Sequence, residues 1–92
     1  PTIPVRLAFE EASLRIPIDA ILPLREVTDS IRKSMKYGQI AASINEVGII
    51  EPPVVVRDAK NRDRYLLLDG HLRVDILHKR GDKEVVCLVA TD

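Results

Sequence analysis

Glycine and proline interrupt this chain at three places, and these interruptions limit the length of every helix and strand in its C-terminal half. The first covers residues 48–53, the second is Asp69 with Gly70, and the third is Gly81. Proline cannot continue a helix, and glycine favours helix ends and tight turns. The chain must therefore form several short elements, each closed by one of these interruptions.

Two stretches between the interruptions have helical periodicity. Ile40, Ile44 and Val47 recur at a spacing of about one turn, which predicts a helix over residues 37–47 with one apolar face. A second helix is predicted over residues 72–80, again with apolar residues on one side.

The other apolar runs predict strands, which cover residues 14–18, 54–57, 65–68 and 85–89. Pro17 restricts the first of them to a sheet edge or to the end of a strand, and the last two are continuously apolar, which is typical of interior strands. Residues 25–36 predict a loop or a frayed helix. The sequence therefore predicts an α+β domain in which two main helices cover a small mixed β-sheet.

Length and composition bound the function. A chain of 92 residues forms one domain, and 14 basic against 14 acidic residues exclude a uniformly basic nucleic-acid-binding surface. Three aromatic residues are too few for a platform on which bases stack. No apolar run approaches a membrane span and no signal peptide is present, so we expect a cytoplasmic protein with no membrane partner. Cys87 is the single cysteine, which excludes an internal disulfide and a multi-thiolate zinc site.

The sharpest local feature is the junction at residues 68–73, where a strand ends, glycine turns the chain and a helix begins. The first amides of a helix have no intrahelical partner and carry partial positive charge. With Gly70 allowing close approach and Arg73 offering a forked cation, the junction is a candidate anion site. The alternative is structural: Asp69 caps the helix and Arg73 is solvated. The basic stretch at residues 25–36 is a further candidate for phosphate contact, or simply a solvated face.

Candidates for acid–base chemistry are Asp69, His71 and Glu51, although a solvated carboxylate in the loop is the structural alternative for Glu51. His71 and His78 lie about 10 Å apart along the predicted helix, too far to ligate one metal ion directly, so we expect no metal site. Cys87 lies inside an apolar strand, which indicates a buried structural thiol.

Taken together and in this order, these segments resemble the ParB/sulfiredoxin N-terminal domain, most closely that of RepB-like plasmid-partition and ParB-domain proteins. The resemblance covers residues 14–92, and residues 1–13 form an N-terminal arm. The segments that carry it are residues 16–21, 40–44, 48–56, 65–73, 81 and 85–89.

The resemblance implies a nucleotide-binding domain that binds CTP or another nucleotide with Mg²⁺, with NTP hydrolysis as a candidate activity. It implies a homodimeric bacterial protein for plasmid partition or chromosome segregation, in which a later helix-turn-helix domain, absent here, binds DNA. Since the chain begins with Pro1, we expect it to be part of a longer protein. The residues implied in nucleotide and phosphate binding are Gly48, Ile49, Glu51 and Pro52 in a first box, and Asp69, Gly70, His71, Leu72 and Arg73 in a second.

The second box differs from the ParB pattern of a glycine, an acid, two arginines, a variable residue and a third arginine. Only Gly70 and Arg73 match it, while His71, Leu72 and Asp75 replace the acid and two arginines. The loss of two cations weakens the expected hold on a triphosphate.

The same residues are similar to the Asp-Gly-His-His-Arg motif of ParB-like free-serine kinases. Three functions therefore stay open: a nucleotide-dependent switch in DNA partition, an enzyme of the same fold with kinase-like or nuclease-like activity, and a scaffold domain that has lost ligand binding.

Overall fold

The computed structural model describes residues 13–49 and 51–91, so the predicted N-terminal arm lies outside the described residues except for Ser13. Five strands form one sheet in the order β1-β5-β3-β4-β2. The β1–β5 and β3–β4 pairs are antiparallel, whereas β3–β5 and β2–β4 are parallel. The predicted α+β class with a small mixed sheet is confirmed. In chain order the elements are β1 (Leu14–Pro17), the 3₁₀ turn η1 (Ile18–Ala20), β2 (Ile21–Pro23), α1 (Asp29–Arg32), α2 (Met35–Val47), β3 (Val54–Arg57), β4 (Tyr65–Asp69), α3 (His71–Arg80) and β5 (Glu84–Ala90).

The strand positions agree with the prediction in detail. β1 lies at the sheet edge and ends at Pro17, as the missing proline donor requires. β4 and β5 are both interior strands, each with a neighbour on either side. The short strand β2 was not predicted. It follows η1 directly and pairs with β4 at the other edge of the sheet.

Two side-chain caps decide where the first helices begin. The hydroxyl of Thr28 accepts a hydrogen bond from the Ile31 amide at 3.2 Å and starts α1. The hydroxyl of Ser34 does the same for the Tyr37 amide at 3.2 Å and starts α2. Residues 25–36 are therefore part loop and part short helix, and α2 begins two residues before the predicted helix.

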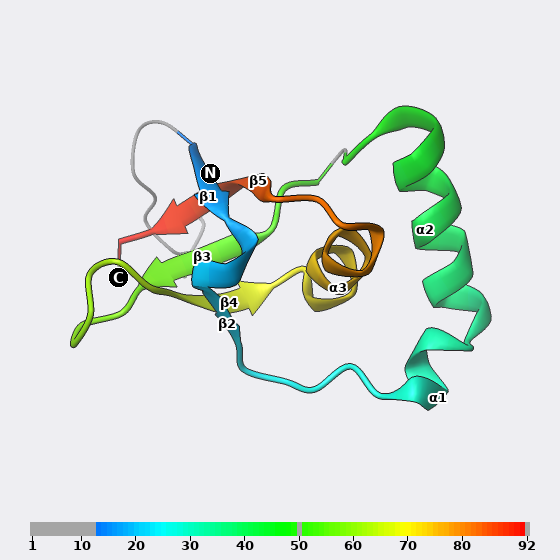
Figure 1. Cartoon of the computed structure of the whole chain (residues 1–92), viewed down its shortest axis with the longest axis horizontal. Coiled ribbons are helices and arrows are strands. Elements are labelled where there is room, and N and C mark those ends of the chain that lie inside the picture. Colours follow the sequence, from blue (N-terminus) through cyan, green and yellow to red (C-terminus); the bar gives the residue numbers. More distant parts are fainter. Residues whose placement is uncertain (1–12, 50, 92) are drawn as a thin grey trace, which may run out of the picture.

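Helix α3 supplies most of the helical side of the core, and Figure 1 shows it between the sheet and α2. Its side chains Val74, Ile76 and Leu77 are buried. Cys87 is fully buried on β5, and burial raises the pKa of its thiol to about 11, as expected of a structural cysteine. The remaining buried core residues are Ile16, Ile18, Ile21, Ile44, Val55, Leu67, Val85 and Val89.

Helix α2 has a narrower apolar face than its sequence predicts. Ile44 is buried and Ile40 is half-buried, but 65% of Val47 is exposed, so the prediction for Val47 was wrong. The reason is its position in the fold, because α2 packs against α3 rather than on the sheet (Figure 1). A helix that packs beside other helices rather than across a sheet buries only a narrow stripe.

Gly70 joins β4 to α3 in a left-handed conformation, with φ of 94°. A Cβ atom at this position would lie 3.1 Å from both Cα and Cβ of Pro53, which is buried. The left-handed conformation therefore favours glycine here, and the tight contact with Pro53 disfavours a side chain further. The contact fixes the start of α3 against the segment that enters β3.

We predict that Gly70→Ala lowers the free energy of unfolding by at least about 2 kcal/mol, because the left-handed conformation alone costs roughly 1–2 kcal/mol for a residue with a Cβ. Gly38→Ala is the matched control: Gly38 is an exposed helical residue whose added Cβ would meet nothing within 4 Å. It should stabilise the domain by about 0.5–1 kcal/mol. Thermal unfolding measures both, and a similar change in the two variants would contradict the role assigned to Gly70.

Candidate functional site

The first turn of α3 presents backbone amides without a side-chain cap. Its N-cap is Gly70, and no described side chain accepts a hydrogen bond from the first amides. Asp69 thus does not cap the helix, which removes part of the structural alternative. The amides of residues 71–73 carry the positive end of the helix dipole and favour an anion.

A pocket of about 620 Å³ opens at this end of α3, within the range of small-molecule sites. Asp69, Gly70, His71, Leu72 and Arg73 all line it, so the structure brings the whole second box together. The opposite wall comes from the loop before α1, from α1 itself and from the first turns of α2.

The pocket combines a cationic region with an aliphatic wall. Its basic side chains are those of Arg25, Lys36 and Arg73, so two of the three come from the basic stretch noted in the sequence. Glu26 and Asp69 add carboxylates, and Ser30 and Ser34 add hydroxyls. The aliphatic wall consists of Val27, Ile31, Ile40 and Leu72.

Arg73 is held by Glu51, its neighbour from the first box. Nη2 of Arg73 donates to Oε1 of Glu51 at 2.8 Å. The Arg73 side chain is 27% exposed, whereas that of Glu51 is 77% exposed. Glu51 therefore forms an ion pair with Arg73, the residue that is the candidate for binding phosphate.

The structure separates the rest of the first box from the second. Gly48, Ile49 and Pro52 line a different groove of about 430 Å³, together with Arg80 and Asp82 near the other end of α3. Within that groove, Arg80 pairs with Asp82 at 2.7 Å. Of the nine predicted binding residues, six thus lie at the start of α3 or contact it there, and three do not.

His71 is fixed by the chain segment after β2. Its Nε2 accepts a hydrogen bond from the Leu24 amide at 3.3 Å, and its buried Nδ1 has no partner among the described residues. Burial lowers the pKa of His71 below its ordinary value, the charge of Arg25 lowers it further, and Asp69 opposes both. The lone pair that a general base needs is therefore occupied in this structure. His71 also lines a second cavity of about 560 Å³, and the two cavities share Arg25, Glu26 and Val27.

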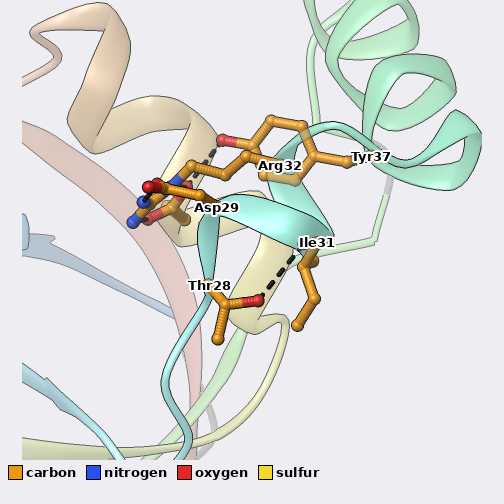
Figure 2. A network of polar contacts seen from close by, with 6 residues as sticks. Thr28, Asp29, Ile31, Arg32 and Tyr37 are labelled. Atoms are coloured by element: carbon orange, nitrogen blue, oxygen red, sulfur yellow. Dashed lines mark hydrogen bonds and ion pairs between the residues drawn. The ribbon is translucent and has the colours of Figure 1, made fainter.

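A network of polar contacts fastens α1 and α2 to α3 (Figure 2). Arg32 binds Asp75 with two hydrogen bonds, from Nε at 3.1 Å and from Nη2 at 3.0 Å. The Tyr37 hydroxyl donates to the same carboxylate at 2.6 Å, and Arg32 also donates to Asp29 at 2.9 Å. Figure 2 shows Arg32 and Tyr37 converging from α1 and α2 on this point.

The network shifts the pKa values of its members in opposite directions. Desolvation alone would raise the pKa of Asp75, but the hydrogen bonds from Arg32 and Tyr37 outweigh it and hold that pKa below its ordinary value. Desolvation and the bond to Asp75 raise the pKa of Tyr37 to about 12. Asp75 thus joins α3 to α1 and α2, which supply the opposite wall of the pocket. No local sequence pattern indicates this role, because the partners lie 38 and 43 residues away along the chain.

Within residues 13–49 and 51–91, no group of three histidine, cysteine, aspartate or glutamate residues is placed to hold a metal ion. No described helix is long and apolar enough to cross a membrane.

Comparison with known proteins shows the family of this chain. A family model described as the ParB N-terminal domain matches residues 6–92. The chain belongs to the ParB N-terminal domain family. The family predicted from the sequence is confirmed.

Members and structural neighbours of the ParB N-terminal domain family differ in function. The ATP-dependent L-serine kinase of Staphylothermus marinus is 27% identical over 74 residues, which are 80% of this chain and 27% of the kinase. C-terminally truncated ParB from Caulobacter crescentus, complexed with CTP-gamma-S, has a TM-score of 0.68 and 20% identity over 88% of this chain and 45% of that one. Sulfiredoxin from Arabidopsis thaliana has a TM-score of 0.67 and 17% identity over 87% of this chain and 85% of its own.

The two structural similarities show that the fold is ParB/sulfiredoxin-like, as predicted. This chain spans less than half the length of the kinase and of the ParB chain.

We predict that acidification destabilises the domain through His71. Since its pKa is lower in the folded state than the unfolded value of about 6.5, the unfolded chain binds the proton more readily, and stability falls as the pH drops below about 6.5. Urea unfolding at about pH 7.5, 6.5 and 5.5 measures this dependence. His71→Gln should flatten it, whereas His78→Gln, which changes an exposed histidine on the same helix, should retain it. An equal slope in the His71 variant and the unmodified protein would contradict the prediction.

Proposed function

We propose that this domain binds a nucleotide in the pocket at the start of α3 and acts as the nucleotide-binding switch of a ParB/RepB-like DNA-partition protein. DNA would be bound by a helix-turn-helix domain elsewhere in a longer, homodimeric protein. The observation that carries the proposal is the combination, in one pocket, of uncapped helix amides and Arg73 with an aliphatic wall.

In this assignment the phosphate lies against the amides of residues 71–73 and the guanidinium of Arg73. Gly70 lines the same pocket, and its left-handed turn sets where the free amides of α3 begin. The aliphatic wall faces the sugar and base, and Lys36 and Arg25 add charge at the rim. Mg²⁺, where it takes part, would be held mainly by the phosphates and water, as is usual for this ion.

The comparisons support a nucleotide but leave its identity open. The ParB from Caulobacter crescentus was crystallised with a CTP analogue, whereas the Staphylothermus marinus relative is an ATP-dependent kinase. Testing cytidine and adenine nucleotides side by side therefore separates the two relationships.

A second candidate is phosphoryl transfer to a small molecule, which the 27% identity to the kinase favours. Asp69 lies in the pocket, and Glu51 contacts Arg73 there, so both carboxylates are near the proposed phosphate position. The hydrogen bond from Leu24 to His71 disfavours histidine as the base. Formation of ADP from ATP in the presence of candidate acceptors would support this function, and binding without turnover would favour the switch.

We predict that Arg73→Ala weakens nucleotide binding by about 1.5–3 kcal/mol, or roughly 10- to 150-fold in Kd, because it removes a charged hydrogen-bond donor. Calorimetric titration with CTP, ATP, ADP and GTP, each with and without Mg²⁺, measures the loss. Arg80→Ala is the matched control, since it removes the same charge at the other end of α3.

Unchanged affinity in the Arg73 variant would contradict the assigned phosphate position. A larger loss in the Arg80 variant would place the ligand in the groove of Gly48 and Pro52 instead. If the unmodified domain binds none of the four nucleotides, the scaffold function gains support.

A further inference from the structure

Glu51 occupies the guanidinium group on which the proposed phosphate site depends. The distance from its Oε1 to Nη2 of Arg73 is 2.8 Å. Carboxylate and phosphate oxygens make the same kind of charge-assisted contact with arginine. A nucleotide must therefore compete with Glu51 for this group.

The exposure of the two side chains makes that competition feasible. Glu51 is 77% exposed and lies in the segment between α2 and β3, while Arg73 is 27% exposed and fixed on α3. When the pair separates, the carboxylate returns to water and the arginine stays in the pocket. Ion pairs with such an exposed partner are weak, so a phosphate can displace the carboxylate.

The net charge of the pocket depends on Glu51. Three cations belong to the pocket, those of Arg25, Lys36 and Arg73. Glu26 and Asp69 offset two of them, and Glu51 offsets the third. With Glu51 in place the site is neutral, and without it the site has a net positive charge.

We propose that Glu51 is a specificity-determining residue that competes with phosphate for Arg73 and favours ligands with few phosphates over triphosphates. A displaced carboxylate remains near the site because Glu51 is two residues from the buried Pro53, and its repulsion increases with the negative charge of the ligand. Discrimination by a repulsive group is a common means of specificity. This inference rests on the proposed function.

The experiment titrates the mono-, di- and triphosphates of cytidine and adenosine into Glu51→Gln and the unmodified domain. We expect Glu51→Gln to tighten triphosphate binding about three- to tenfold and monophosphate binding less, because glutamine keeps the shape and removes the charge. The gain should shrink between about 0.05 M and 0.5 M salt. Glu84→Gln is the matched control: it removes an equal charge from another exposed ion pair, with Arg15, and should change no affinity.

Equal affinities of Glu51→Gln and the unmodified domain would overturn the inference and leave the proposed function standing. An equal gain for mono- and triphosphates would overturn the selectivity. If neither protein binds any of the six nucleotides, the proposed function fails together with the inference. Binding by Glu51→Gln alone would support the competition directly.

Discussion

The contact between Pro53 and Gly70 is the constraint on which the rest of this domain depends. Pro53 is buried, its carbonyl accepts a hydrogen bond from the Leu88 amide at 2.9 Å, and its Cα and Cβ atoms would lie in tight contact, at 3.1 Å, with a Cβ atom added at Gly70. One residue thus ties the start of β3 to an interior strand and to the first turn of α3. The proposed phosphate site depends on this contact, because Gly70 is the N-cap of α3 and leaves the first amides without a side-chain cap.

The ion pair between Arg32 and Asp75 joins α1, which supplies part of the opposite wall, to α3. In the ParB pattern an arginine stands at the position of Asp75, where it adds positive charge. Here the position carries a carboxylate that binds Arg32 and Tyr37 instead. A carboxylate therefore stands where the family pattern has a cation. Its hydrogen bonds hold α1 and α2 against α3 (Figure 2). The remaining positive charge of the pocket depends on Arg73 and on residues contributed by the loop and by α2, and that dependence makes the competing carboxylate of Glu51 influential.

Local patterns predicted the elements well, because glycine, proline and apolar periodicity act over a few residues. Pro17 indicated the edge strand, and the continuous apolar runs indicated the interior strands β4 and β5. The caps by Thr28 and Ser34 were overlooked, which shifted the start of α2, and the exposure of Val47 followed from packing against α3 that no local pattern encodes. That the residues of the second box line one pocket could be predicted, because they form a single turn of chain. The separation of Gly48, Ile49 and Pro52 from Glu51 could not, since it depends on how the segment before β3 lies against α3.

Backbone amide shifts give the most direct test of the central claim, that the first turn of α3 binds the phosphate of a nucleotide. Two-dimensional NMR spectra of the ¹⁵N-labelled domain, recorded during titration with CTP and with ATP, report on every amide at once. The account predicts that the largest shifts occur at residues 70–74, with smaller shifts in the loop before α1 and at the start of α2. Shifts confined to Gly48, Ile49 and the end of α3 around Arg80 would contradict it, as would the absence of shifts with both nucleotides.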